Sequence, residues 1–277
     1  MLPVVFYIFL FVFFLFFGSF LKVVVDRVIR GEQFLKGRSY CEACNHKLST
    51  PDLIPLFSFI IQKGRCRHCK DKIPVQSLLA EITSGLVFTT LLYWYFEKFF
   101  IDLSGLTFQD YLFVLVVLVL SIFLYLIFFS DMGYMLIPDI YLYCVLGIYV
   151  IFGILYYLGV LDGNYWGIFY ANWGSHIMSA VWLLIFFWLL YFFSKGKAMG
   201  EGDVFLAPIL GLYLTFELSI VMWMAAFVFG ALFGVLLILL NKKGIKSQVP
   251  FGPFLVIGFV LAFIFGVEMV DYYLSIL

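Results

Sequence analysis

Residues 111–131 read YLFVLVVLVLSIFLYLIFFSD, which is a run of twenty residues without a charge followed by an aspartate. A helix of about twenty such residues can cross the hydrocarbon core of a bilayer. Similar apolar runs recur along the 277-residue chain, which is 65% hydrophobic. Only 12% of its residues are charged, against about 25% in a soluble domain. The sequence therefore predicts an all-α, polytopic membrane protein.

Polar breaks divide the chain into eight predicted spans, which we expect to pack as one transmembrane helical bundle. The first is read as a retained span because it lacks a basic start and a small-residue cleavage site. The sixth is short, and the break at Thr215–Glu217 that follows it is the weakest boundary. The predicted spans cover residues 1–25, 78–96, 111–130, 139–160, 175–194, 204–217, 219–240 and 251–275.

The basic residues are unevenly distributed, although the formal net charge is zero and gives no sign of a nucleic-acid partner. Ten of the 17 Lys and Arg lie between Arg27 and Lys72. With eight spans, this stretch falls on the same side as loops 195–203 and 241–250, and only Lys98 lies opposite. Because basic loops stay in the cytoplasm, we expect this side to be cytoplasmic and both termini to be outside. If the chain had seven spans instead, the orientation of the helices after the Thr215–Glu217 break would be reversed.

The longest polar stretch, residues 26–77, contains four of the five cysteines. Two Cys-x-x-Cys pairs, Cys41/Cys44 and Cys66/Cys69, are separated by 21 residues. This spacing is typical of a four-thiolate zinc ribbon, so we predict that these four residues bind Zn²⁺. The alternative is a pair of disulfides or free thiols, and a reducing cytoplasm disfavours disulfides.

Three further residues near these motifs have less specific interpretations. His46 and His68 lie beside the cysteines and either compete for the metal or face solvent, which is the more common arrangement. Cys144 stands alone inside an apolar span. Because a free cysteine behaves as a small hydrophobe, we predict that Cys144 is a core residue.

Four acidic residues stand where predicted spans meet the cytoplasmic face. Asp131 and Asp139 begin and end DMGYMLIPD, and Glu201 and Asp203 lie in GEGD. Ionisable residues at such places are costly and commonly functional. If the bundle brings Asp131 and Asp203 together, one carboxyl can hold a proton while the other activates a water, as in an aspartic protease. The alternative is that these acids cap helices or lie among lipid headgroups, and Asp139 looks like a capping or first-turn residue.

Six motifs follow one another along the chain. They are 18-GSFLKVVVDR-27, the double Cys-x-x-Cys loop with 64-GRCRHC-69, Glu81, 131-DMGYMLIPD-139, 200-GEGD-203 and 250-PFGPF-254. In this order they resemble the bacterial type IV prepilin peptidases, also called prepilin leader peptidase/N-methyltransferases, along nearly the whole chain. Six ordered motifs are far more specific than any one of them.

The resemblance implies an enzyme of the bacterial cytoplasmic (inner) membrane with two activities. As an aspartic endopeptidase of the GxGD membrane type, it would remove the basic leader of prepilins or pseudopilins, with Asp131 and Asp203 as the catalytic pair. As a methyltransferase, it would then methylate the new N-terminal residue, commonly Phe, using S-adenosylmethionine. Such substrates serve type IV pili and protein secretion.

The resemblance also implies a division of the chain. Residues 1–25 would form the first transmembrane helix, 26–77 a cytoplasmic zinc-binding region associated with methyl transfer, and 78–277 the peptidase domain. No Gly-rich fingerprint for S-adenosylmethionine is visible, so its binding residues are unknown, and we expect them on the cytoplasmic loop. In or beside this region, three residues depart from the family pattern: Lys22, Asp26 and Leu53, which with Ile54 stands where Asn-Ile is common.

Two other classes of protein compete with this interpretation. One class is the other intramembrane proteases of the GxGD type. Archaeal preflagellin peptidases usually lack the double Cys-x-x-Cys loop, and presenilin-like enzymes have their first aspartate in a Tyr-Asp pair, whereas here Ser130 precedes Asp131. Both therefore fit less well. A transporter or membrane assembly factor with a zinc ribbon would typically show internal repeats and broken helices at the bilayer midplane. No repeat is visible here.

Overall fold

The structure is a computed structural model that describes residues 4–33, 37–99, 108–161, 172–197, 199–240 and 249–276. Apart from two isolated β-bridges, the regular secondary structure of the described residues is all helical, and loops connect the helices. Much of the predicted loops 97–110, 161–174 and 241–250, and the side chain of Lys98, lie outside the described residues. The helices are α1 (Val4–Ile29), η1 (Thr50–Leu53), α2 (Phe57–Ile61), α3 (Val75–Phe99), α4 (Phe108–Tyr134), α5 (Asp139–Tyr157), α7 (Trp173–Ser194), α8 (Glu201–Gly211), α9 (Phe216–Leu239) and α10 (Gly252–Ile276).

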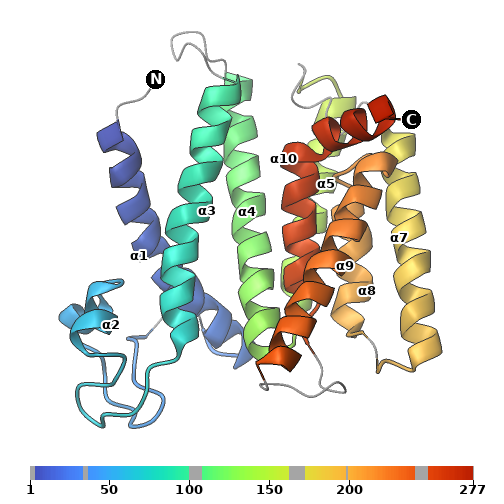
Figure 1. Cartoon of the computed structure of the whole chain (residues 1–277). Coiled ribbons are helices and arrows are strands. Elements are labelled where there is room, and N and C mark those ends of the chain that lie inside the picture. The colour runs from blue at the N-terminus through green and yellow to red at the C-terminus, as the bar shows by residue number, and fades with distance from the viewer. Residues whose placement is uncertain are drawn as a thin grey trace. The chain divides into compact units, whose positions relative to one another are not determined.

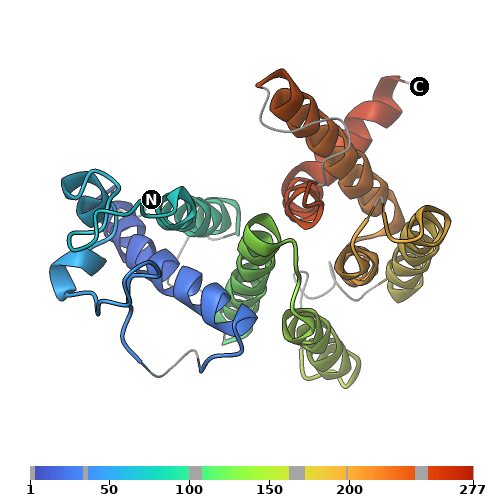
Figure 2. The same cartoon turned by 90° about the horizontal axis from the view of Figure 1, so that it is seen from below.

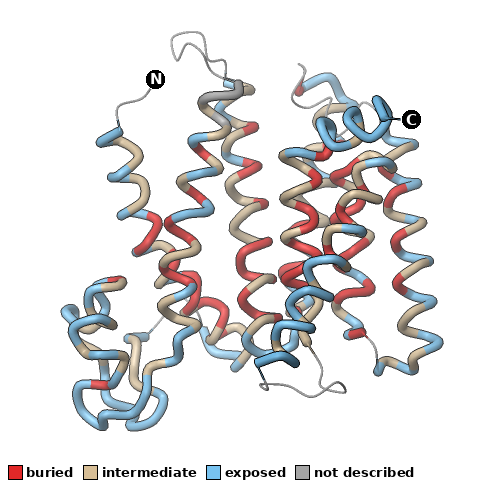
Figure 3. Tube along the Cα trace, in the orientation of Figure 1, coloured by how far each residue is buried: buried red, intermediate tan, exposed pale blue. Residues whose placement is uncertain are grey.

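Seven of the described helices, α1, α3, α4, α5, α7, α9 and α10, are long and apolar enough to cross a membrane, judged by length and composition. Their outer surfaces are apolar as well: on α9, Val228, Leu232 and Val235 are each more than half exposed. Figure 3 shows exposed residues along the whole length of α7. Helices that are apolar all round require lipid or protein on every face, so the predicted polytopic helical fold is confirmed.

The predicted sixth span, residues 204–217, differs from the structure. It corresponds to α8, which has 11 residues and is therefore about 16 Å long, too short for a hydrocarbon core of about 30 Å. After Gly211 the chain forms a turn, and Thr215 is the N-cap of α9. The predicted break at Thr215–Glu217 is thus found. Figure 1 shows the chain reversing between α7 and α8 and again between α8 and α9.

The chain divides into two compact units, Met1–Phe129 and Ser130–Leu277, so that α4 begins in the first and ends in the second. In the first unit, α1 and α3 cross closely at Gly18, where a Cβ would lie 1.8 Å from Ser84 Oγ. The Ser84 hydroxyl lies 2.7 Å from the Phe14 carbonyl oxygen. Tyr125 on α4 donates a hydrogen bond to the Ala80 carbonyl of α3. These contacts hold the three helices together around the start of α3.

In the second unit, close packing fixes the position of α8. Figure 2 shows α8 between α7 and α10. A Cβ on Gly211 would lie 2.7 Å from Leu183 of α7, so α8 packs directly against that helix. Just beyond α8, the Leu212 carbonyl oxygen lies 3.0 Å from His176 Nδ1, and the Tyr213 hydroxyl donates to the Val145 carbonyl of α5 at 2.7 Å. The C-terminal end of α8 is therefore fixed against α7 and α5.

Candidate functional site

Asp131 lies in the last turn of α4 and is 5% exposed. The helix ends four residues later, where Met135 has a φ of 52° and its N–H donates to the Asp131 carbonyl at 2.8 Å. A left-handed residue is a common helix terminator. The side chain is held separately, because its Oδ2 accepts a hydrogen bond of 2.9 Å from the backbone N–H of Gly252.

Gly252 is the first residue of α10 and contributes one of the N–H groups that a helix N-terminus leaves without an intrahelical partner. That group points at the Asp131 carboxyl. A Cβ on Gly252 would lie 2.8 Å from Asp131 Oδ2 and 3.2 Å from Ile137 Cδ1. A side chain at this position would therefore displace the carboxyl, and glycine permits the approach.

Asp203 is the third residue of α8, which Gly200 precedes as the N-cap. It too is 5% exposed. Its Oδ1 is buried and has no hydrogen-bond partner in the described part of the chain. An unpartnered buried carboxyl oxygen is costly and calls for an explanation, such as a catalytic role.

The two aspartates meet within the second unit. A Cβ on Gly202 would lie 3.0 Å from Ile137, the same side chain that approaches Gly252, so Ile137 lies between the starts of α8 and α10. Asp131 lies near the same side chain, because a Cβ on Gly252 would be close to both Asp131 Oδ2 and Ile137 Cδ1. Two neighbouring buried carboxyls do not readily ionise together. The arrangement can therefore supply one acid and one base.

The other two acids of these motifs lie elsewhere. Asp139 and Glu201 are exposed, and they occupy the first turns of α5 and α8. Negative charge there is favoured by the helix dipole. The structure thus separates the four candidates into a buried pair and two exposed helix-start residues. Sequence reasoning missed Gly252 and Ile137, although the quoted motifs PFGPF and DMGYMLIPD contained both residues.

The four predicted ligands in the first unit converge. One sulfur from each of Cys41, Cys44, Cys66 and Cys69 lies within 4.8 Å of the others, and Cys41 Sγ is 3.8 Å from Cys69 Sγ. None of the four forms a disulfide. A tetrahedral ion with metal–sulfur distances of about 2.3 Å sets its sulfurs roughly 3.8 Å apart. The cluster can therefore hold a metal ion.

The two cysteine loops have the same backbone geometry. In each, the residue after the second cysteine is left-handed, with φ of 55° at Asn45 and 62° at Lys70. Each of these N–H groups bonds back to the first cysteine, Asn45 to the Cys41 carbonyl at 2.8 Å and Lys70 to the Cys66 carbonyl at 3.0 Å. The backbone N–H groups of Cys69 and His68 lower the pKa of the Cys66 thiol to about 7, whereas burial raises the pKa of the Cys41 thiol.

His46 and His68 do not belong to the four-sulfur cluster. Both are exposed, and their ring centroids lie 3.5 Å apart with the ring planes tilted by 35°. One histidine comes from each cysteine loop, so this ring contact lies where the two loops meet. The solvent-facing interpretation of these residues agrees with their exposure.

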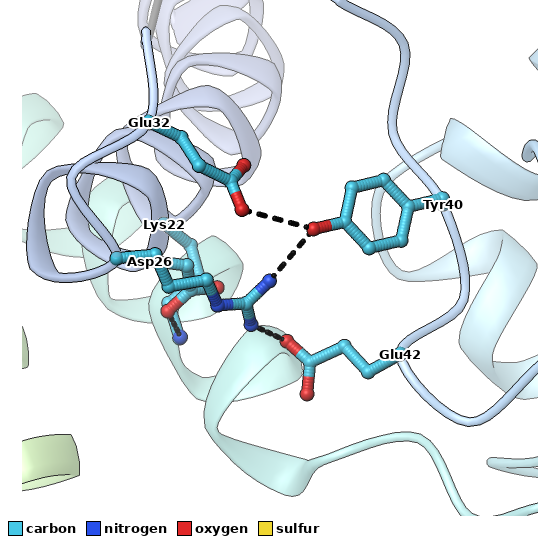
Figure 4. Close-up of polar contacts among 6 residues, drawn as sticks. Lys22, Asp26, Glu32, Tyr40 and Glu42 are labelled. Carbon is cyan, nitrogen blue, oxygen red and sulfur yellow. Dashed lines mark hydrogen bonds and ion pairs between the residues drawn. The ribbon is translucent and has the colours of Figure 1, made fainter. Parts of the chain in front are cut away.

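The polar segment between α1 and α3 is fastened by several charged contacts. Arg27 on α1 is buried, and it donates to the Gly37 carbonyl at 3.2 Å. Arg30 binds Glu42 and donates to the Tyr40 hydroxyl, which in turn donates to Glu32 (Figure 4). The end of α1 is thereby tied to the first cysteine loop.

The second cysteine loop is tied to η1 by Asp52, which forms an ion pair of 3.1 Å with Arg67. The Ser49 hydroxyl, its backbone N–H and Arg67 hold the pKa of Asp52 below its usual range. A third connection runs to α3, where Glu81 Oε2 accepts a hydrogen bond of 2.9 Å from the Leu56 N–H.

Lys22 and Asp26 pair their charges. The two residues form an i,i+4 ion pair on α1 (Figure 4), and Lys22 is buried. A buried charge is tolerated when it is paired. The carboxylate of Asp26 thus neutralises the buried Lys22.

The chain is similar in sequence to known proteins over both of these sites. Residues 12–96 match the Bacterial Peptidase A24 N-terminal domain, and residues 118–235 match the Type IV leader peptidase family. A prepilin leader peptidase/N-methyltransferase of Aeromonas salmonicida (strain A449) is 30% identical over 304 residues, which cover 99% of this chain and 96% of the relative. One of Bacillus subtilis (strain 168) is 27% identical over 270 residues, covering 96% and 97%.

No solved structure matches the chain. The two family matches together cover the cysteine cluster and both buried aspartates, and the relatives align along nearly the full length. The resemblance seen in the six motifs is confirmed, and the chain belongs to the type IV leader peptidase family.

Proposed function

We propose that this protein cleaves the leader peptide of prepilins or pseudopilins and then methylates the new N-terminus. The observation that carries the proposal is the buried pair Asp131 and Asp203, brought together at the ends of α4 and α8. The names of the related proteins supply the substrate class and the second activity.

In the cleavage step, one aspartate is protonated and the other is a carboxylate. The carboxylate takes a proton from a water molecule as the water oxygen attacks the scissile carbonyl carbon. The resulting tetrahedral intermediate collapses, the C–N bond breaks, and the leaving nitrogen takes the proton of the other aspartate. Gly252 holds the Asp131 carboxyl through its N–H and leaves room for it by having no side chain.

The substrate must present its scissile bond to these carboxyls at a membrane surface. Asp131 ends one predicted span and Asp203 opens the short helix α8. A prepilin has a short basic leader followed by an apolar helix, and such a chain would lie with its polar part in water and its apolar helix among the spans. The basic loops assign this surface to the cytoplasmic side of the inner membrane.

The cysteine cluster is proposed to bind Zn²⁺ as a structural ion. Four thiolates complete a tetrahedral site and leave no open position for a substrate. The metal would hold the two cysteine loops together within the polar segment. S-adenosylmethionine is the proposed methyl donor, and we place its site on residues 26–77 without assigning side chains. The methyl group would pass from its sulfonium to the new α-amino nitrogen, which loses a proton.

The test is the intact mass of a prepilin incubated with the purified protein and S-adenosylmethionine. We expect loss of the leader and gain of one methyl group. Asp131→Asn and Asp203→Asn should each slow cleavage by about 100-fold or more, because each removes an acid or base from the reaction. Asp139→Asn and Glu201→Gln are matched controls, since these acids belong to the same motifs but are exposed.

Three results would contradict part or all of the proposed function. Full cleavage by either Asn variant would overturn the two-aspartate mechanism. Cleavage without a methyl group would restrict the proposal to the peptidase. An unchanged substrate mass would contradict both activities.

A further inference from the structure

The polar segment between α1 and α3 carries an apolar face on α2. Phe57, Ile60 and Ile61 are 65%, 67% and 73% exposed. They stand at positions i, i+3 and i+4, which lie on one side of a helix. Leu53 and Ile54, immediately before α2, are each 40% exposed. We call Phe57, Ile60 and Ile61 the α2 face.

The opposite side of α2 is already packed. The Phe59 ring covers Gly64, where a Cβ would lie 3.0 Å from the ring. Pro55, just before α2, is buried. Side chains of the segment's own small core thus occupy the inner side. The α2 face is a second apolar surface, and its contact with water is unfavourable.

The position of α2 relative to α3 indicates what covers this face. The Leu56 N–H, at the start of α2, donates to Glu81. Glu81 lies six residues beyond Val75, where α3 begins, which is about 9 Å along the helix axis. Figure 1 shows α2 beside α1 and α3, above the lowest loops of the polar segment. The start of α2 is therefore held beside the spanning helix α3, at a point beyond the first turn of that helix.

That depth matches a membrane interface. An amphipathic helix lying in the interface buries its apolar side about 5–10 Å into the boundary between headgroups and acyl chains. The outer surfaces of the neighbouring spans are apolar as well, with Phe20 on α1 45% exposed and Leu86 on α3 52% exposed. The α2 face and these outer surfaces of α1 and α3 are thus all apolar and exposed, as a lipid environment requires.

The charges that follow α2 fit the same partner. Residues 63–72 contain five basic side chains and one acidic side chain. Lys63, Arg65, Lys70 and Lys72 are all exposed. Basic groups beside an inserted apolar face attract the anionic headgroups of the leaflet. This pattern distinguishes a lipid surface from a purely apolar protein partner.

We propose that α2 is an interfacial anchor, with Phe57, Ile60 and Ile61 among the acyl chains and the basic residues after it among anionic headgroups. The anchor holds the cysteine cluster at a set height above the bilayer, because α2 lies between the two cysteine loops in sequence. It requires no activity of either proposed site.

The test uses the full-length protein in nanodiscs of phosphatidylethanolamine and phosphatidylglycerol. A small share of the lipid carries a photoreactive diazirine on an acyl chain, and labelled peptides are identified by mass spectrometry after irradiation. The peptide that contains Leu86 is the internal positive control for labelling. The exposed polar peptide that contains Lys47 is the internal negative control. We expect the α2 peptide to be labelled as strongly as the Leu86 peptide. In a Phe57→Glu/Ile61→Glu variant its label should fall to the Lys47 level.

Thr50→Glu is the control, because it adds a negative charge at an exposed position outside the α2 face. It should leave the label unchanged. A wild-type α2 peptide labelled no more than the Lys47 peptide would overturn the proposal, even if the double variant failed to fold. A wild-type α2 peptide that is protected from lipid and cross-links to a second copy would also overturn it.

Discussion

At the scale of single residues, glycines decide how the aspartates are held. Gly252 lets a backbone N–H reach Asp131, and Gly202 lets α8 approach Ile137. In both places a Cβ would lie 3.0 Å or less from a neighbouring side-chain atom. The buried pair therefore depends on the absence of side chains as much as on the carboxyls themselves.

Gly252→Ala should impair cleavage while leaving the protein folded. The added methyl group would press on Asp131 Oδ2, and a displacement of about 1 Å in a catalytic group can cost about 100-fold in rate. The measurement is the rate of leader removal, followed by mass, beside a thermal unfolding curve in detergent. Gly234→Ala on α9 is the control, because its Cβ would meet nothing within 4 Å. Equal cleavage by both variants would contradict the role given to Gly252.

At the scale of elements, the two cysteine loops are a repeated unit. Each is closed by hydrogen bonds between its own backbone groups, so the geometry around each Cys-x-x-Cys pair is local. Bringing the pairs together is not local, and it involves the contacts of η1 and α2 with their neighbours. A metal ion would stabilise the meeting of the loops rather than each loop alone.

Cys44→Ser should reduce the metal content of the purified protein from about one zinc per chain to a trace, because three thiolates bind zinc much less firmly than four. Elemental mass spectrometry measures the metal directly and does not depend on activity. Cys144→Ser is the matched control, since Cys144 lies on α5 outside the cluster. Zinc retained by Cys44→Ser, or lost from Cys144→Ser, would disprove the assignment of the ligands.

At the scale of the whole molecule, the path of the chain through the membrane depends on α8. Within the described residues, seven helices are long enough to cross, but α8 and the turn after it reverse the chain once more before α9. The charge distribution also favours eight passes, because the basic loops then share one side. We therefore propose that the short helix α8, packed against α7, acts as a pass in the topology.

Reporter fusions should reveal this path. We expect a fusion after Gly159 to be outside, one after Gly196 to be cytoplasmic, and one after Ile276 to be outside. Alkaline phosphatase is active only outside, and green fluorescent protein fluoresces in the cytoplasm. The two reporters therefore give two independent measurements of the location of each fusion site. If the fusion after Ile276 were found on the same side as Gly196, α8 would not reverse the path, and the eight-pass topology would be wrong.

The sequence by itself determined the helices, the class of protein and the cysteine cluster, because apolar runs and Cys-x-x-Cys spacing are properties of neighbouring residues. It named Asp131 and Asp203 as the pair and interpreted Asp139 as a capping or first-turn residue. The tertiary structure added that the pair is buried while Asp139 and Glu201 are exposed, and that Asp131 is held by a hydrogen bond from a residue 121 positions away. The short α8 and the exposed face of α2 were likewise decided by packing, since long-range contacts leave no local periodic signal in the chain.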